Sequence, residues 1–468
     1  MSTPHVLAFA GIQHEQLRAQ LFPGDGLEAA AILLCSRSIG PRVRLLVRDM
    51  IMIPHTACRE RRPDFIAWPG AYVEDALERA EADDLTLVFI HSHPGGQFAF
   101  SSTDDASDRL LMPSAIANHG AFHASAIMVS NGAVRARWYG PNLAPQPIEL
   151  VTVTGHDIAY WWARDAVHGT PSPRPMAFTQ AMTAEMGRLT AMVIGVSGTG
   201  SIAAEQINRL GFGRVKHTDF DVVEFKNLNR ILNAKTNDAA TRRLKVEMFV
   251  EAVEGYRDSG VAEALPFSIL TREAILAAGQ CDVLFCCVDS LEARQILDMI
   301  AAAYLLPLID VGVVIPTRQA GTTRAIADVC GRIDYVQPGR SSLKDRGVYT
   351  PESLRAEYLR QNAPESHQQE LEAGYIRGTI DEAPAVISLN MRAASAGVNE
   401  FIARAYPFRH EPNERYARTQ FSLAACEEEY VAEGAYGTHA YTYLLGTGSQ
   451  EPLLGMPFLA PTLPAGVA

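Results

Sequence analysis

A glycine-rich turn between a buried strand and a helix constrains the fold more than any other feature of this chain. The turn is Gly195-Val196-Ser197-Gly198-Thr199-Gly200, and the short apolar run Met192–Ile194 precedes it. Residues 201–210 follow with helical spacing, and residues 215–218 form a second strand that ends at Asp219. This order predicts the α/β start of a nucleotide-binding domain, with phosphate at the helix N-terminus.

The residues after this unit separate two classes of nucleotide binder. An acidic residue about 20 positions beyond the glycines, here Asp219, would suit a dinucleotide oxidoreductase. The run Asp219-Phe220-Asp221-Val222-Val223-Glu224-Phe225-Lys226-Asn227-Leu228-Asn229-Arg230 instead resembles the hallmark of the ThiF/MoeB/E1 superfamily, which activates ubiquitin-like C-termini. Lys245, Asp289 at the end of the strand 283–288, and Arg294 follow in family order. The resemblance covers roughly residues 176–405.

The resemblance implies ATP and Mg²⁺ as cofactors and an acyl-adenylate as product. Asp219 would hold the ribose hydroxyls, Arg230 and Lys245 would grip phosphates, and Asp289 would bind Mg²⁺. Asn227 would support the phosphate contacts, whereas Asp221 could equally brace the turn. The implied nucleotide-binding residues are Gly195, Gly198, Gly200, Asp219, Asp221, Asn227, Asn229, Arg230, Lys245 and Asp289.

The chain departs from the family pattern in two respects. Ser197 stands where the family usually has a glycine, and no Cys-x-x-Cys pair is present. We therefore expect no structural zinc around residues 336–342. A thioester cysteine is also unassigned: Cys426 and Cys330 are the candidates, and a structural role is open for each. The superfamily commonly supplies an arginine across a dimer interface, for which Arg174 and Arg188 are alternatives.

A second set of chemically active residues lies near the amino end. His91-Ser92-His93-Pro94 leaves the apolar run of residues 85–90, which reads as a buried strand. Alternate strand residues point the same way, so the two imidazoles share a face. Ser101-Ser102-Thr103-Asp104 follows, and Ser101 or Ser102 can cap a helix that Asp104 opens. Two nitrogens and one carboxylate oxygen form a three-ligand set that leaves a fourth zinc position for water.

This spacing resembles the JAMM (JAB/MPN) metalloprotease signature, His-x-His-Pro followed by Ser-x-x-Asp. The resemblance implies that His91, His93 and Asp104 hold zinc, which lowers the pKa of a bound water to about 7. Glu28, which enters the apolar strand 29–35, would act as general base and then acid. Glu15 is its nearest competitor but precedes no apolar strand. The hydroxyl of Ser101 would stabilise the oxyanion.

These two motifs and the proline-rich segment between them predict an α/β protein with two domains. An α+β JAMM domain is expected over residues 1–150, with a helix at 72–82 and a hairpin around Asn131-Gly132. A helix over 158–167 and a proline-rich linker, placed within 151–175, separate it from a Rossmann-like, mostly parallel adenylation domain at 176–405. Residues 406–468 read as an irregular tail that packs on the adenylation domain.

Composition indicates the cellular compartment and excludes one class of partner. Seven scattered cysteines indicate a reducing compartment, and no signal peptide or membrane span is visible, so a cytoplasmic location is expected. A formal charge of −12 argues against a nucleic-acid partner.

The motifs together predict a bifunctional enzyme that adenylates a ubiquitin-like C-terminus and cleaves peptide or isopeptide bonds after it. Such fusions resemble components of bacterial ubiquitin-like modification operons, some linked to antiphage defence. An E2-like partner and a homodimer are expected by the same analogy. Sulfur-carrier activation in cofactor biosynthesis is the alternative enzyme function. A third alternative is a degenerate JAMM domain that only docks the ubiquitin-like protein.

Overall fold

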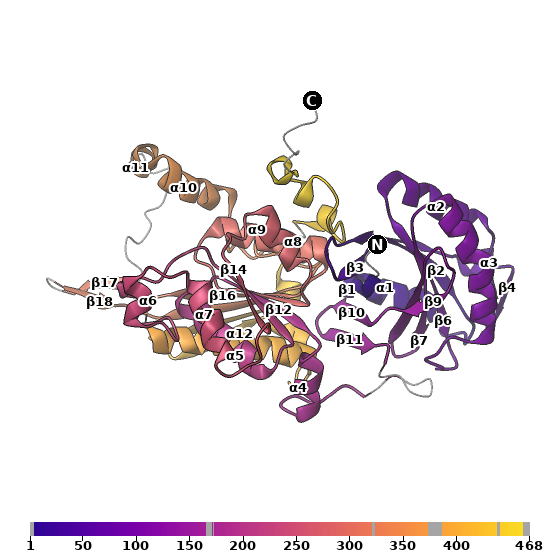
Figure 1. Ribbon diagram of the computed structural model, residues 1–468, viewed down its shortest axis with the longest axis horizontal. Coiled ribbons are helices and arrows are strands. Elements are labelled where there is room, and N and C mark those ends of the chain that lie inside the picture. Colours follow the sequence, from indigo (N-terminus) through magenta and orange to yellow (C-terminus); the bar gives the residue numbers. More distant parts are fainter. Residues whose placement is uncertain are drawn as a thin grey trace. The chain divides into compact units, whose positions relative to one another are not determined.

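The computed structural model describes residues 4–164, 171, 173–320, 323–372, 386–437 and 440–461. The chain forms two compact units, one comprising residues 1–174, 302–305 and 443–468, and the other residues 175–301 and 306–442. Both combine a central sheet with helices (Figure 1), so the α/β fold class predicted from the sequence is confirmed. Residues 165–170 and 172 of the predicted linker lie outside the described residues. Among the residues described, no helix is both long and apolar enough to cross a membrane.

The first unit is built on a nine-stranded sheet in the order β11-β10-β1-β3-β2-β6-β7-β8-β9. Its strands are β1 (Pro4–Ala10), β2 (Ala30–Arg37), β3 (Val43–Met52), β6 (Thr86–His93), β7 (His123–Val129), β8 (Val134–Tyr139), β9 (Pro145–Pro147), β10 (Leu150–Thr154) and β11 (Ile158–Trp162). A small separate sheet pairs β4 (Glu60–Arg62) with β5 (Phe65–Ala67). The helices are α1 (Gly11–Leu21), α2 (Ala71–Asp83) and α3 (Ser102–Asn118).

Both faces of this sheet are covered. Ala31, Leu33 and Cys35 of β2 pack in one apolar cluster with residues of α1. The alternate residues of the same strand pack in a second cluster with residues of α2 and α3. Because successive strand residues point to opposite faces, a strand that is apolar throughout must lie between two such layers. The strand β6 is packed on both sides in the same way, with Val88 and Ile90 in the first cluster and Leu87 and Phe89 in the second, just before its histidines.

Residues 150–162 correct the sequence analysis. The segment expected to open a helix at Ile158 is the edge strand β11, and β10, next to it, pairs in parallel with β1 of the first sheet. Ile158-Ala159-Tyr160-Trp161-Trp162 alternates between buried and partly buried positions and pairs antiparallel with β10. Aromatic and β-branched side chains favour such a pleated, half-buried surface over a helix. The first unit thus extends past residue 150.

The second unit contains an eight-stranded sheet in the order β14-β13-β12-β15-β16-β19-β20-β21. The pairings from β14 to β16 are parallel and those from β16 to β21 antiparallel. The strands are β12 (Thr190–Ile194), β13 (Arg214–Thr218), β14 (Ala262–Leu265), β15 (Val283–Cys286), β16 (Leu308–Val314), β19 (Cys330–Val336), β20 (Arg418–Ser422) and β21 (Glu427–Val431). A separate hairpin joins β17 (Thr317–Ala320) and β18 (Thr323–Ile326).

Helices cover both faces of the second sheet, with α5, α7 and α12 on one face and α8 and α9 on the other (Figure 1). Its helices are α4 (Gln180–Met186), α5 (Gly198–Leu210), α6 (Thr236–Ala240), α7 (Lys245–Glu254), α8 (Arg272–Ala278), α9 (Leu291–Tyr304), α10 (Pro351–Asn362), α11 (Pro364–Glu372) and α12 (Ile387–Ala405). The strand order reverses between β12 and β15. Ligands of open α/β sheets bind at the carboxyl ends of the strands at such a point.

The carboxy-terminal residues also correct the expectation for the tail. Residues 406–442 belong to the second unit and supply β20 and β21, whereas residues 443–461 pack in the first unit. The hydroxyl of Ser36 donates to the carbonyl of Gly446 at 2.5 Å. A Cβ at Gly446 would lie 2.4 Å from the carbonyl oxygen of Val47. The glycines that made the tail look irregular in sequence therefore allow its backbone to approach the first sheet closely.

Candidate functional site

The two histidines at the end of β6 converge with the first turn of α3. Nε2 of His91 lies 3.0 Å from Nε2 of His93 and 3.0 Å from Oδ1 of Asp104. Nε2 of His93 lies 3.4 Å from Oδ2 of Asp104. Donor atoms of a tetrahedral zinc site with bonds of about 2.0–2.2 Å stand roughly 3.3–3.6 Å apart. The residue types fit a zinc ion, and the separations of 3.0–3.4 Å lie at or slightly below this range.

Local capping explains why Asp104 faces the histidines. Ser101 is the N-cap of α3, and its hydroxyl accepts a hydrogen bond from the Asp104 backbone N–H at 3.2 Å. The Ser101 N–H donates to Oδ2 of Asp104 at 2.5 Å. This reciprocal pair is a capping box, which fixes both side chains at the helix start. The side chain of Asp104 is thereby aimed out of the helix toward β6.

Electrostatics favour an ionised Asp104 beside the rings. Burial opposes ionisation of Asp104, but its hydrogen bonds with His91 and His93 hold its pKa far below the usual range. Burial lowers the pKa of His93, yet hydrogen bonds to Asp104 and to the Gln97 carbonyl give a net rise. Nδ1 of His93 donates to that carbonyl at 2.8 Å, because a carbonyl can only accept. In a neutral His93 ring the free lone pair is therefore on Nε2. This nitrogen faces Nε2 of His91 and Oδ2 of Asp104.

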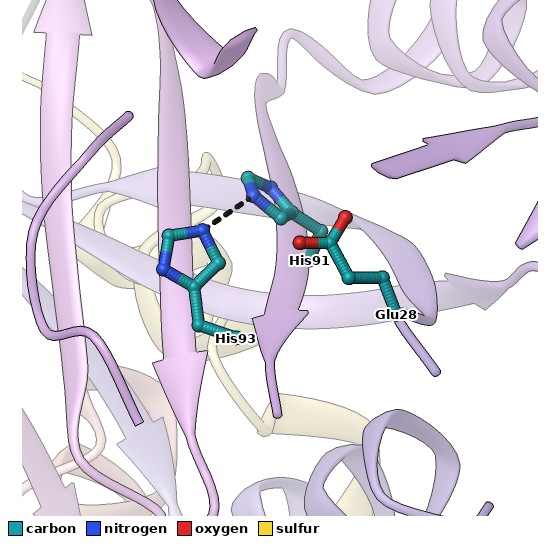
Figure 2. A group of neighbouring side chains, drawn as sticks. All are labelled: Glu28, His91 and His93. Carbon is teal, nitrogen blue, oxygen red and sulfur yellow. Dashed lines mark hydrogen bonds between the residues drawn. The ribbon is translucent and has the colours of Figure 1, made fainter. Parts of the chain in front are cut away.

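Glu28 lies against the same pair of rings. Its carboxylate and the ring nitrogens of His91 and His93 fall within 4.8 Å of one another, and Figure 2 shows the three side chains pointing together. Only 5% of Glu28 is exposed, and burial raises the pKa of its carboxyl to about 7, partly offset by the two histidines. A carboxyl group with this pKa can accept or donate a proton near neutral pH. Glu15, its competitor, is exposed on α1.

Backbone contacts that the sequence did not reveal hold Glu28 in place. The Glu28 N–H donates to the Arg62 carbonyl at 2.9 Å, and Nε of Arg61 donates to the Glu28 carbonyl at 2.8 Å. The Ser92 hydroxyl oxygen accepts from the Ala29 N–H at 2.9 Å. Nothing in the sequence pattern marks Arg61 or Ser92, because their partners are backbone atoms of another segment.

The second site is a cavity of about 1080 Å³ where the strand order of the second sheet reverses. It opens beyond the carboxyl ends of β12 and β15. Of the residues implied in nucleotide binding, those that line it are Gly195, Gly198, Asp219, Asp221, Arg230, Lys245 and Asp289. Gly200, Asn227 and Asn229 do not line it and have supporting positions instead.

The glycine turn is sterically required. Gly195 has φ of 84°, which disfavours a side chain, and a Cβ there would lie 3.0 Å from the Cys287 carbonyl oxygen. A Cβ on Gly200 would lie 1.6 Å from the Gly195 carbonyl oxygen. The first turn of α5 can therefore fold back on the end of β12 only with glycine at position 200. Ser197, Gly198 and Thr199 line the cavity at the start of this helix, where unpaired N–H groups favour anions.

The acidic and basic residues of the motif are braced from several sides. Asp219 accepts hydrogen bonds from the N–H groups of Val196 at 2.8 Å and Asp221 at 2.9 Å. Burial raises its pKa, and Lys245 opposes this rise. Nζ of Lys245 lies 2.7 Å from Oδ2 of Asp221. Asp221 thus pairs with the lysine, which is compatible with the bracing role left open by the sequence.

Two asparagines of the motif organise the loop that carries Arg230. Oδ1 of Asn227 accepts from the Glu224 N–H at 3.0 Å, which closes a short turn. Oδ1 of Asn229 accepts from Nη1 of Arg230 at 3.1 Å. A Cβ on Gly198 would lie 3.2 Å from Cδ of Arg230, so the arginine stem covers the helix start. These contacts direct Arg230 across the mouth of α5.

A buried ion cluster lies beside the cavity, and the sequence analysis named its Arg294 but missed the partners Asp310 and Arg332. Nε of Arg294 donates to Asp310 at 3.0 Å, and its Nη2 donates to the Val288 carbonyl at 2.7 Å. Arg332 lines the cavity and also pairs with Asp310, which is fully buried. The contact to Val288 holds the segment that carries Asp289. An acidic residue inside the apolar strand 308–314 was the available signal for this cluster.

The candidate cysteines separate in the structure. Cys330 lines the cavity and donates to Asp328 at 3.2 Å; burial and this carboxylate raise its pKa. Cys426 is exposed in the turn between β20 and β21 and does not line the cavity. Cys287 also lines it, although burial raises its pKa to about 12. Arg174 and Arg188 precede β12 and do not line the cavity, so both remain alternatives for an arginine donated to a partner copy.

Hydrogen bonds and ion pairs organise the segment in which a cysteine pair would fall. The Ser341 N–H donates to Glu433 at 2.7 Å, and the Leu343 N–H donates to Asp298 at 3.1 Å. Arg346 is buried and pairs with Asp334 at 3.2 Å and Glu433 at 3.0 Å. These contacts join residues 341–346 to α9, β19 and the segment after β21. The prediction that this segment holds no structural zinc stays a prediction.

Each unit contains a segment that matches a known family model. Residues 174–396 match the ThiF family model, and residues 13–139 match the model of prokaryotic homologs of the JAB domain. Ubiquitin-like modifier-activating enzyme 5 of Caenorhabditis elegans is 28% identical over 193 residues, covering 38% of this chain and 43% of that protein. The Bombyx mori protein of the same name is 27% identical over 162 residues, covering 33% and 38%. The chain thus spans less than half the length of these curated relatives.

Solved structures show a low overall similarity. Escherichia coli MccB with ATP is 14% identical, covers 54% of this chain and 66% of that chain, and has a TM-score of 0.40. The microcin C7 biosynthetic enzyme MccB in complex with N-formylated MccA is 13% identical, covers 56% and 69%, and has a TM-score of 0.44.

Proposed function

We propose that this protein is a bifunctional enzyme that acts on the C-terminus of a ubiquitin-like protein. The proposal starts from the matches of its two units to the JAB and ThiF family models. The ThiF unit adenylates that C-terminus with ATP and Mg²⁺. The JAB unit hydrolyses peptide or isopeptide bonds that follow it. The observation that carries the proposal is the convergence, in each unit, of residues from separate segments on one reacting centre: Glu28 with the histidine pair, and Asp219, Arg230 and Lys245 with the glycine turn.

Adenylation brings a substrate carboxylate against the negatively charged α-phosphate of ATP, so the enzyme must neutralise charge. A carboxylate oxygen of the substrate attacks the α-phosphorus of ATP, the bond to the β-phosphate oxygen breaks, and pyrophosphate leaves with the electron pair. Arg230, Lys245 and the N-terminus of α5 neutralise phosphate charge, and Asp219 accepts from the ribose hydroxyls. Asp289 is exposed at the cavity edge, where its carboxylate can bind Mg²⁺. Positioning and charge neutralisation supply the rate enhancement.

The cavity supports a polymeric substrate. Small-molecule sites usually measure about 300–1,000 Å³. This one, at about 1080 Å³, extends from the glycine turn along β19 to residues of β20 and β21. It therefore has space for a nucleotide and for the end of an extended polypeptide. This extension favours a protein C-terminus over a free amino acid as the carboxylate.

In the JAB unit, His91, His93 and Asp104 would hold zinc, which supplies Lewis-acid activation of water and of the substrate carbonyl. Glu28 accepts the proton of the attacking water and delivers it to the leaving amine. Ser101 would donate its hydroxyl proton in a hydrogen bond to the developing oxyanion, since its oxygen already accepts from the Asp104 N–H. The complete donor set favours a peptidase over a domain that only docks its partner.

Two readings of the pathway follow from this chemistry. In bacterial ubiquitin-like conjugation that serves antiphage defence, the activated tail passes to an E2-like partner and the enzyme acts as a homodimer. In sulfur-carrier metabolism the adenylate receives sulfur instead. Cys330 beside the cavity suits the first reading, because a thioester cysteine must reach the adenylate.

Incubation of the full chain with ATP, Mg²⁺ and proteins that end in glycine, followed by intact-mass measurement, tests the proposal. We expect an adenylate on the substrate protein, and a thioester or thiocarboxylate would identify the pathway. Elemental analysis should find one zinc per chain. An absence of pyrophosphate release with every such protein, together with an absence of zinc, would overturn the proposed function.

A further inference from the structure

A buried cluster behind the metal-site residues joins α3 to the first sheet. Oδ2 of Asp108 accepts from the Ser125 hydroxyl at 2.6 Å and from the Tyr139 hydroxyl at 2.7 Å. The same oxygen accepts from Arg137 through Nε at 3.0 Å and Nη2 at 2.6 Å. Each of these four residues is at most 8% exposed. A single carboxylate oxygen thus gathers donors from β7 and from β8.

Arg137 reaches the start of α3 by two further contacts. Its Nη1 lies 2.6 Å from Oδ1 of Asp105. Its guanidinium carbon stands 3.8 Å from the ring centroid of Phe100, the residue before the Ser101 cap. The planar guanidinium therefore holds the loop, the cap and the first two turns of the helix at once. Lysine has a single ammonium group and cannot reproduce this set of contacts.

The cluster lies one helical turn from Asp104. Asp104 and Asp108 are four residues apart and share a helix face. The histidines lie on β6, which pairs with β7, and β7 pairs with β8 opposite Arg137. A rigid path thus leads from His91 and His93 across two strand pairings to Arg137, then to Asp108, and one turn back to Asp104. Together with the capping box, this path fixes the position of Asp104 on α3 relative to His91 and His93 on β6.

We infer that Arg137 and Asp108 are positioning residues for the metal site, which set the distance between Asp104 on α3 and the histidines on β6. The inference rests on the proposed zinc-dependent peptidase function. Residues that orient metal ligands typically contribute about 10–100-fold in metal affinity. Loosening the cluster should therefore weaken zinc binding, even though none of its members touches the metal.

Zinc affinity of the full chain, measured by competition with a chromophoric chelator, tests this inference. Arg137→Lys should raise the zinc dissociation constant about 10–100-fold. Removal of Arg137 alone leaves a buried carboxylate, which can prevent folding. The double variant Arg137→Met/Asp108→Leu removes both charges, so it should stay folded and yet bind zinc more weakly than the unmodified chain.

The matched control acts at the other end of α3. Nε2 of His123 lies 2.7 Å from the His119 carbonyl oxygen, and its Nδ1 accepts from the Leu87 N–H at 3.0 Å. His123→Gln should lower the melting temperature without changing the zinc dissociation constant. Folded Arg137 variants with unchanged zinc affinity, or an equal loss in His123→Gln, would overturn the inference. If the unmodified chain binds no zinc, the proposed peptidase function fails as well.

Discussion

The hydroxyl oxygen of Ser92 accepts a hydrogen bond from the backbone N–H of Ala29 at 2.9 Å, and the Ser92 N–H donates to the Ala29 carbonyl at 2.9 Å. Ser92 stands between the two histidines, and Ala29 follows Glu28 directly. One residue therefore registers the segment that carries Glu28 against the strand that carries His91 and His93. The Ser92 side chain is fully buried, and alternation along β6 points it to the face opposite His91 and His93.

Ser92→Ala should lower peptidase turnover while leaving the zinc content unchanged. The substitution leaves the buried Ala29 N–H without its acceptor, at a cost of about 1–3 kcal/mol in stability. Glu28 would then be held less firmly relative to the rings. Turnover of a cognate fusion and the melting temperature, measured on the same preparation, check this. Wild-type turnover in a destabilised variant would contradict the positioning role.

Glu28→Gln should retain zinc and lose about 10²–10⁴-fold in peptidase turnover, because the amide cannot accept the proton. Glutamine preserves the shape of the side chain and its backbone contacts. Glu15→Gln, on the exposed side of α1, is the control and should have wild-type turnover. If Glu28→Gln cleaves the fusion normally, the proton acceptor lies elsewhere.

Gly200→Ala should abolish ATP binding. The added Cβ would lie 1.6 Å from the Gly195 carbonyl oxygen, so α5 must move away from the glycine turn that lines the cavity. Overpacking of this kind typically costs about 1–3 kcal/mol in stability. Gly434→Ala, where no atom lies within 4 Å of the new Cβ, is the matched control. Nucleotide affinity is measured by calorimetry, and unchanged affinity in Gly200→Ala would contradict the packing argument.

Asp289→Ala should reduce ATP–pyrophosphate exchange by about 10²–10³-fold, the usual effect of removing one electrostatic contact to a reacting group. Asp289 is exposed at the cavity edge, so its loss should leave the melting temperature unchanged. Asp258→Ala, an exposed aspartate that does not line the cavity, controls for net charge. Normal exchange in Asp289→Ala would remove this residue from the site.

Cys426→Ala should leave adenylation unchanged, because Cys426 lies in an exposed turn outside the cavity. Its φ of 57° strains alanine and cysteine alike, so little stability should be lost. Non-reducing gels with a glycine-ending substrate would then show whether a reducible adduct forms. An adduct that survives this change but not Cys330→Ala would assign the thioester to the cavity, and loss of adenylation would contradict the prediction.

Local patterns were sufficient where a motif and its element are contiguous. The run 85–93 was expected as a buried strand ending in two histidines, and β6 covers Thr86–His93. The glycine turn, the helix after it and Asp219 were placed in the same way. Ile158–Trp162 was misread as a helix, because its strand pairing with β10 is a contact that propensity cannot show in a short aromatic run.

The sequence by itself determined the two domain types, the histidine pair and the glycine turn. Each was recognisable because its residues are neighbours in the chain and adopt a fixed local geometry. Only the tertiary structure decided that Glu28 rather than Glu15 meets the histidines, that Arg294 and Asp310 hold the segment before Asp289, and that Arg137 fixes α3 to the sheet. Those arrangements depend on contacts between residues far apart in the chain. Such contacts form only when strands pair and helices pack, so no local pattern encodes them.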